Sequence, residues 1–438
     1  MSEILIRGGR IIDPASDMDE TGDLLVSGGV VAEAGGRITR VEAEVIDADG
    51  AVVAPGLVDL HVHLREPGRE DEETIGSGSA AAAKGGFTAV VAMPNTDPVC
   101  DNAAVAEKVH GRGQIVGLVH VHPAGAITKG LEGTHLAPIG EMARSAARVR
   151  LFTDDGRGVQ DARLLRRAME YLKGFDAICA EHCEDEKLSD GGHMHEGEFS
   201  SHLGLKGIPS ESEEVALARD LALARMTGVR FHALHVSTGG AAELVRRAKV
   251  EGVRVTAEAT PHHLCLTDAE LVSYDTNLKV NPPLRSGSDL EALRTALADG
   301  TIDAIATDHA PHSAEEKEAE FEAAPPGLIG LETALAVVVT ELVGSGVITL
   351  PQAIRLMSFN PARIAGLEGH GGLIAAGAPA NLVVFDPAAR WVVHPAELAS
   401  LSRNTPWAGK TLTGRVLHTV LDGRLVVRDG MPLEEVPA

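Results

Sequence analysis

The sequence has few aromatic residues, only four cysteines and no long apolar run. Aromatic residues make up 3% of the 438 positions while 44% are hydrophobic, so the core must be aliphatic. The cysteines form no Cys-x-x-Cys pair, which argues against a disulfide framework and favours a reducing compartment. No apolar run reaches the roughly 18 residues of a membrane span, and no secretory signal pattern opens the chain. We therefore expect a soluble, cytoplasmic protein with no membrane partner.

Positive charge is also scarce. Lys and Arg number 39 against 63 Asp and Glu, which gives a formal net charge of −24 at pH 7. This excess of negative charge repels phosphates, so nucleic acid is not an expected partner. A small anionic substrate is not excluded, because one local arginine can outweigh a distant acidic surface. The length suits one large α/β barrel with extra elements, or two to three ordinary domains.

Both ends of the chain have the pattern of short strands. The expected strands are Glu3–Arg7, Gly22–Val26, Ala51–Ala54, Asn381–Asp386, Thr419–Gly423 and Arg424–Val427. Gly, Pro and Asp turns separate them, and no helix of normal length fits at the N-terminal end. We therefore expect residues 1–54 and 369–438 to form one small composite β-sandwich domain.

The middle of the chain, residues 55–368, alternates between strand and helix patterns. Helical patterns include the Ala-rich stretch Thr74–Lys84 and the stretch Glu213–Met226. The expected strands are 57–64, 88–94, 114–121, 149–153, 177–181, 230–236, 253–259 and 303–307. Eight such units match a (β/α)8 TIM-like barrel, whose active site lies where the strands end. An open doubly wound sheet is the alternative, but no Gly-x-Gly-x-x-Gly follows an early strand to support it.

Side chains that can bind metal follow five of the expected barrel strands. His61 and His63 are residues i and i+2 of an extended chain, so they leave the same face, and Arg65 follows on that face. The other four strands end near Asp154 and Asp155, His182, His235, and Asp308. In a barrel these residues meet at one mouth, where four His and two or more Asp suffice for two divalent ions with a bridging ligand. A lone His-x-His pair more often caps a strand, so the prediction depends on this convergence.

Long motifs surround these residues. They are Asp-Leu-His-Val-His-Leu-Arg-Glu-Pro-Gly (59–68), Met-Pro-Asn-Thr (93–96), Ala-Glu-His-Cys-Glu-Asp (180–185), His-Val-Ser-Thr (235–238), Asn-Pro-Pro-Leu-Arg (281–285) and Ala-Thr-Asp-His-Ala-Pro-His (306–312). Through nearly the whole chain they resemble dihydroorotase, of the bacterial long-chain, class I type in the amidohydrolase superfamily. The resemblance implies a (β/α)8 barrel with a composite β domain, in agreement with the strand and helix pattern.

The resemblance also implies a metal site with two zinc ions per subunit. One ion would be bound by His61, His63 and Asp308, the other by His182 and His235, and Asp155 would bridge them. Asp154 stays open as the rival for the bridging role. Many amidohydrolases bridge their metals with a carbamylated lysine, but we expect none here, because no Lys lies at the end of the fourth strand.

The implied reaction is the reversible cyclisation of N-carbamoyl-L-aspartate to L-dihydroorotate, in pyrimidine biosynthesis. A metal-bridging hydroxide would be the nucleophile and Asp308 the general acid and base. The implied substrate-binding residues are Arg65, Asn95 and His312 for the substrate carboxylate, and Asn281 with the backbone near Gly327 for the other polar edge of the ring.

Two other functions stay open. A hydantoinase or allantoinase would share the barrel and the His-x-His pair, but the missing bridging lysine and the presence of Arg65 with Asn95 argue against it. A non-catalytic scaffold for aspartate transcarbamoylase should have lost metal ligands, whereas all six positions carry the expected type.

Two further expectations concern the protein's partners and a second histidine pair. Barrels of this kind commonly pair, so we expect a homodimer, with aspartate transcarbamoylase as the candidate protein partner. A second pair, His120 and His122, ends the third expected strand. We expect it not to bind metal, because the third strand gives no ligand in the family that the chain resembles.

Overall fold

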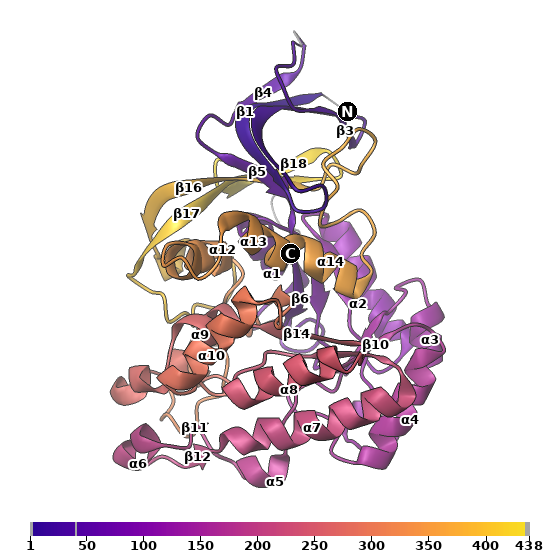
Figure 1. Ribbon diagram of the computed structural model, residues 1–438, viewed down its shortest axis with the longest axis vertical. Coiled ribbons are helices and arrows are strands. Elements are labelled where there is room, and N and C mark those ends of the chain that lie inside the picture. The colour runs from indigo at the N-terminus through magenta and orange to yellow at the C-terminus, as the bar shows by residue number, and fades with distance from the viewer. Residues whose placement is uncertain (1–2, 40–41, 434–438) are drawn as a thin grey trace.

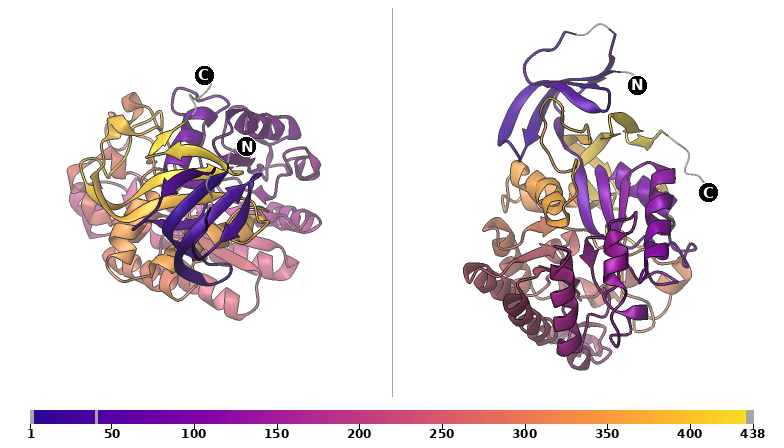
Figure 2. Two further views of the ribbon diagram at one scale, coloured as in Figure 1. Left: turned by 90° about the horizontal axis from the view of Figure 1, so that it is seen from above. Right: turned by 90° about the vertical axis from the view of Figure 1, so that its right-hand side faces the viewer.

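The computed structural model describes residues 3–39 and 42–433. It has the expected architecture, a (β/α)8 barrel with a β-sheet made from both chain ends (Figure 1). The indigo strands of the N-terminus and the yellow strands of the C-terminus lie together at one end of the barrel, and the helices surround the barrel strands (Figure 2). In the described part of the chain, no helix has both the length and the apolar character that a membrane span requires.

The terminal sheet joins the two chain ends strand by strand. Its order is β19-β18-β17-β16-β5-β1-β2-β3, and β4 pairs with β1. Its strands are β1 (Ile4–Asp13), β2 (Met18–Ser27), β3 (Val30–Ala34), β4 (Glu44–Asp47), β5 (Val52–Pro55), β16 (Leu382–Val392), β17 (Thr411–Leu421), β18 (Arg424–Arg428) and β19 (Met431–Pro432). Strands β5 and β16 form the seam, where Val53 lies opposite Val384. Ile11 and Val420 belong to the same buried cluster as this pair, so both ends share one core.

Eight parallel strands form the barrel. They are β6 (Leu57–Val62), β7 (Phe87–Ala92), β8 (His120–Pro123), β9 (Leu151–Phe152), β10 (Ile178–Glu181), β13 (Arg230–Ala233), β14 (Val255–Ala259) and β15 (Ala304–Ile305). Hydrogen bonds join β6-β7-β8 and β15-β14-β13-β10-β9. Two isolated bridges close the ring, from Gly125 to Phe152 and from Val62 to His309. The interior is aliphatic, as expected, with a buried cluster that includes Leu60, Val91, Leu151, Ile178 and Ala304.

Helices connect these strands. The longer ones are α1 (Ile75–Lys84), α2 (Ala103–Val116), α4 (Ala162–Lys173), α7 (Ser210–Thr227), α8 (Gly239–Val250) and α10 (Gly287–Ala298). Shorter elements are α3 (Ile139–Arg144), α5 (Glu186–Ser189), β11 (Met194–His195), α6 (Glu198–Leu203), β12 (Gly207–Ile208), α9 (Pro261–Cys265), α11 (Ala314–Lys317), α12 (Ala334–Val337), α13 (Leu350–Ile354) and α14 (Asn360–Ala365). The two helices expected from the sequence are confirmed as α1 and α7. Thr74 caps α1, because its side chain accepts the backbone N–H of Ser77.

The third barrel strand was expected at residues 114–121, and this prediction is wrong. Helix α2 continues to Val116, and β8 begins only at His120. Gly117 ends the helix with a φ of 66°, which glycine adopts at little cost. Ile115, whose apolar side chain suggested a strand, is 69% exposed on the helix. The apolar residues on both sides of Gly117 therefore belong to two different elements.

We propose that the sheet and the barrel are separate domains, with the boundaries expected from the sequence. Strand β5 ends in the terminal sheet at Pro55, and β6 begins the barrel at Leu57. At the other boundary, α14 ends at Ala365 and β16 begins at Leu382. Each part has a buried apolar cluster of its own, which is the physical basis for the division.

Candidate active site and metal centre

The structure brings the six side chains that were expected to bind metal to one end of the barrel. They lie at or just after the ends of five strands: His61 and His63 at β6, Asp155 after β9, His182 after β10, His235 after β13 and Asp308 after β15. All six are buried. Because parallel barrel strands all end on the same face, residues far apart in the sequence meet there.

Asp155 lies between four imidazole rings. Its Oδ1 is 3.4 Å from His61 Nε2, 3.5 Å from His235 Nε2 and 3.8 Å from His182 Nδ1, and its Oδ2 is 3.5 Å from His63 Nε2. These separations suit ligands that share an ion at about 2.0–2.2 Å. His61 Nε2 and Asp155 Oδ1 are buried and have no hydrogen-bond partner in the described chain. Buried polar atoms without a partner are costly, so the donor set fits bound metal ions.

Asp154 faces away from this cluster. Its Oδ1 accepts the backbone N–H groups of Ile127 at 2.8 Å and Thr128 at 2.9 Å, and the Thr128 hydroxyl contacts its other oxygen. Asp154 therefore ties the segment after β8 to the end of β9. This geometry supports Asp155 as the bridging residue.

Asp308 completes the cluster on the side of β6. Its Oδ1 is 3.1 Å from His63 Nε2 and 3.5 Å from His61 Nε2. Burial opposes its ionisation, but the charges and hydrogen bonds of these two histidines hold the pKa of Asp308 well below its usual range. The backbone of Asp308 has a φ of 48°, a conformation that non-glycine residues seldom adopt and that recurs at functional sites.

A buried glutamate that the sequence analysis missed orients His61. Glu258 of β14 lies with Oε1 2.9 Å from His61 Nδ1 and Oε2 3.0 Å from His232 Nε2. Burial opposes the ionisation of Glu258, yet the hydrogen bonds from His232 and His61 hold its pKa at about 2. An ionised carboxylate only accepts hydrogen bonds, so His61 carries its proton on Nδ1 and turns the lone pair of Nε2 toward Asp155. The signal in the sequence was a glutamate inside a short strand that is otherwise Val, Thr and Ala.

The rings of two other histidines are held in the same way. His63 Nδ1 is 2.9 Å from Asn95 Oδ1, which leaves Nε2 for the cluster. His182 Nε2 is 3.0 Å from Glu184 Oε2, which leaves Nδ1. Glu184 belongs to the motif at residues 180–185, but the sequence analysis gave it no role.

The expected substrate-binding residues line a cavity of about 220 Å³ beside the metal-binding cluster. Its walls include Arg65, Asn95, Asn281, His312 and Gly327 together with His63, Asp155, His182, His235 and Asp308. No lysine is among the residues that line it. The structure thus brings together, around one cavity, the residues for which the sequence analysis expected metal-binding and substrate-binding roles, except His61, which lies behind the cavity wall in contact with Asp155.

Contacts on the side away from the cavity hold the Arg65 side chain in place. Its Nε is 3.0 Å from Glu72 Oε2 and donates to the Pro311 carbonyl at 3.0 Å, and its Nη2 is 3.3 Å from His312 Nε2. A guanidinium has five N–H donors, so these contacts leave donors for a ligand carboxylate. Arg65 is therefore a largely buried cation at the cavity wall and not part of a surface ion pair.

Gly327 lies in the loop that forms the outer wall of the cavity. Its N–H donates to the Lys279 carbonyl at 2.8 Å, and its carbonyl accepts from Lys317 Nζ at 3.0 Å. Its φ is 144°, and a Cβ there would lie 2.9 Å from atoms of Ala310 and His312. Glycine thus allows the close approach of this loop to His312. The two lysines that hold the loop gave no recognisable signal in the sequence.

The second histidine pair lies within β8, not at its end. His120 is the first residue of the strand and His122 the third. His120 Nδ1 is 2.8 Å from His370 Nε2, and His120 Nε2 is 3.0 Å from Asp422 Oδ2. His120 therefore connects the start of β8 to the turn between β17 and β18. The expected position at a strand end was wrong because the strand begins later than the apolar pattern suggested.

Comparisons with known proteins agree with this site. A family model described as Dihydro-orotase-like matches residues 50–241. A dihydroorotase of Pelotomaculum thermopropionicum is 50% identical over 427 residues, which cover 98% of this chain and 99% of that protein. A dihydroorotase of Streptomyces coelicolor is 51% identical over 430 residues, again 98% and 99% of the two chains.

Solved structures show the same architecture. An L-hydantoinase (dihydropyrimidinase) of Arthrobacter aurescens has a TM-score of 0.88 at 26% identity and covers 99% of this chain and 98% of its own. A dihydropyrimidinase of Brevibacillus agri has a TM-score of 0.85 at 23% identity, covers 99% and 97%, and shows the fold alone. Half of all residues are shared with the dihydroorotases, over nearly their full length, but only a quarter with the hydantoinase. The chain belongs to the dihydroorotase family.

Proposed function

We propose that this chain is a metal-dependent dihydroorotase, which interconverts N-carbamoyl-L-aspartate and L-dihydroorotate in pyrimidine biosynthesis. The observation that carries the proposal is one cavity in which Arg65, Asn95 and His312 face the ligand cluster around Asp155. An anion-binding wall beside a metal-binding wall suits a cyclic amide that carries a carboxylate. The names of the relatives support the same activity.

The ligand cluster would hold two divalent ions, for which zinc is our candidate. We propose His61, His63 and Asp308 for one ion, His182 and His235 for the other, and Asp155 as the bridge. When bound, such ions polarise a carbonyl oxygen and make water a nucleophile at neutral pH. Three of the four imidazoles that face Asp155 are already oriented, by Glu258, Asn95 and Glu184.

The chain's own residues would position the substrate and move the proton. Arg65 binds the substrate carboxylate, and Asn95 donates through Nδ2 because its Oδ1 is engaged by His63. In ring opening, Asp308 takes a proton from the attacking water and delivers it to the ring nitrogen that leaves. In ring closure, Asp308 takes a proton from the carbamoyl nitrogen and returns it to the departing water. Its carboxylate is ionised, which is the form that can accept this proton.

Turnover of L-dihydroorotate by the purified protein tests this function, with hydantoin and allantoin as control substrates and metal content measured on the same sample. We expect ring opening of dihydroorotate only, with close to two zinc ions per chain. Turnover of hydantoin or allantoin instead would assign the chain to another cyclic amidohydrolase. A protein without activity and without metal would be a non-catalytic scaffold. The homodimer and the aspartate transcarbamoylase partner stay proposals, which sedimentation of the chain alone and with that enzyme would test.

We expect Arg65→Met to raise KM for dihydroorotate by on the order of 100-fold and to change kcat less. Methionine keeps an unbranched apolar stem but removes the guanidinium and with it every charge-assisted hydrogen bond to the substrate carboxylate. Steady-state kinetics in both directions measure the effect. An unchanged KM would remove Arg65 from the substrate site. Arg166→Met, which changes an exposed arginine on α4, is the control.

We expect Glu258→Gln to weaken zinc affinity by about 10- to 100-fold while the fold stays intact. A glutamine amide can donate to His61 Nδ1, which would favour the tautomer with its proton on the ligand nitrogen Nε2. Competition with a chromophoric chelator measures the affinity without relying on activity. Glu251→Gln, an exposed glutamate just before the same strand, should leave the affinity unchanged, and equal affinity in both variants would contradict the role of Glu258.

A further inference from the structure

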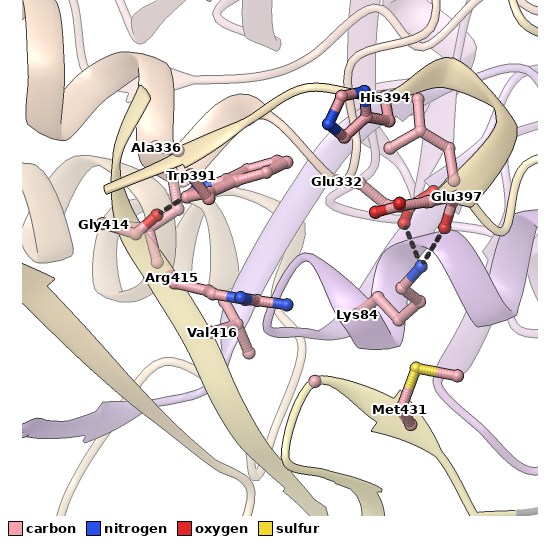
Figure 3. A pocket seen from close by; sticks show the side chains of 13 residues that line it. Lys84, Glu332, Ala336, Trp391, His394, Glu397, Gly414, Arg415, Val416 and Met431 are labelled. Carbon is pink, nitrogen blue, oxygen red and sulfur yellow. Dashed lines mark hydrogen bonds and ion pairs between the residues drawn. The ribbon is translucent and has the colours of Figure 1, made fainter. Parts of the chain in front are cut away.

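A cavity of about 320 Å³ lies between the terminal sheet and the barrel, apart from the active site. None of the residues that line it also lines the active-site cavity. Figure 3 shows the side chains of Trp391 and Arg415 on one side, and Lys84, Glu332 and Glu397 on the other. Cavities of this volume hold small organic molecules in many proteins.

Two opposite charges at this cavity have no partner. Lys84 Nζ forms an ion pair with Glu332 at 2.8 Å and donates to the Glu397 carbonyl at 2.8 Å, so its charge is already balanced. The guanidinium of Arg415 and the carboxylate of Glu397 form no hydrogen bond or ion pair with any residue in ranges 3–39 and 42–433. Both side chains are exposed, so water solvates them in the free protein. A molecule that contacts both needs an anionic group and a hydrogen-bond donor.

Trp391 gives the cavity an aromatic wall. Its indole N–H donates to the Gly414 carbonyl at 2.9 Å, which fixes the ring against β17. The ring is half-buried, and the buried residues Leu335, Leu398 and Val416 supply further apolar surface. A fixed aromatic face of this kind stacks well on a planar ring.

We propose that this cavity binds a planar aromatic molecule with one anionic group and one N–H donor. Trp391 stacks on the ring, Arg415 binds the anion and Glu397 accepts from the donor. Among the described residues that line the cavity, Arg415 is the only cation without an ionic partner. Glu397 repels a second negative charge, so the ligand is a monoanion and not a polyphosphate. This site is additional to the proposed dihydroorotase activity and does not depend on it.

Residues in the wall of this cavity are connected by hydrogen bonds to residues that contact the active site. The Glu332 carboxylate accepts the backbone N–H of Ala399 at 2.7 Å. The hydroxyl of the next residue, Ser400, donates to Glu73, and Glu73 Oε2 is 3.2 Å from His309 Nε2. His309 directly follows the proposed acid and base in the chain. A ligand in the cavity would therefore contact the segment 397–400, which also contacts Glu73, the partner of His309.

Fluorine NMR of the full chain labelled with fluorotryptophan tests the proposal, with para-aminobenzoate as the probe. The chain has only two tryptophans, so Trp391 and Trp407 give two signals that Trp391→Phe assigns. Trp407 is buried and does not line the cavity, so it serves as an internal reference. We expect a saturable shift of the Trp391 signal alone, and no response of that signal would overturn the proposal.

Variants and truncated probes test each contact separately. Arg415→Gln should weaken binding at least ~10-fold through loss of the charge-assisted contact, while Arg390→Gln, an exposed arginine on β16 outside the cavity, should not. Benzoate lacks the donor and aniline lacks the anion, so each should bind more weakly than para-aminobenzoate. Equal affinity in the two variants, or equal shifts of both tryptophan signals, would refute the site. The readout is a resonance and not turnover, so failure of this proposal is distinguishable from failure of the proposed function.

Discussion

Replacing Asp308 by asparagine is expected to lower kcat by about 10²- to 10⁴-fold while much of the metal stays bound. The asparagine oxygen can still act as a ligand, and the neighbouring His61 and His63 are unchanged, so the cluster keeps most of its donors. The amide cannot take up a proton at any pH near neutrality, so both directions of the reaction should be lost together.

Kinetics in both directions, with metal analysis of the same sample, measure this effect. Asp299→Asn changes an exposed aspartate just before β15 and should leave both turnover and metal content unchanged. Near-normal turnover in Asp308→Asn would remove this residue from proton transfer. Loss of turnover together with all metal would instead make Asp308 mainly a ligand.

Replacing Asp155 by asparagine is expected to reduce the bound metal from two ions to at most one, and turnover by at least about 10³-fold. The carboxylate faces four imidazoles and, in the part of the chain that the structure describes, is the only one within 4 Å of imidazoles from both halves of the cluster. A neutral amide offers one oxygen and less charge, so it bridges two cations poorly.

The neighbouring Asp154→Asn is the matched control. Its amide oxygen can still accept from Ile127 and Thr128, so we expect two ions and nearly normal turnover. Metal analysis by mass spectrometry separates the variants. If Asp154→Asn lost the metal and Asp155→Asn kept it, the bridging role would pass to Asp154.

The sequence by itself determined the fold class and the convergence of the ligand-type residues. His61 and His63 are two residues apart on a strand, and strands alternating with helices in parallel order end on one face. These are local periodicities, and a local periodicity can be read from the sequence without knowledge of the contacts between distant segments. The aliphatic core and the sheet from both chain ends followed from composition and pattern in the same way.

Only the tertiary structure decided which of two adjacent aspartates faces the metal-binding cluster and which residues hold the ligands in place. Asp154 and Asp155 look alike in the sequence, and the end of β9 turns one toward Thr128 and the other toward the imidazoles. Glu258 meets His61 across 197 positions of the chain, a contact that closure of the barrel creates. The start of β8 depended on Gly117, whose backbone conformation ends a helix within an apolar run. Such features depend on packing between distant segments, for which a single sequence has no periodic signal.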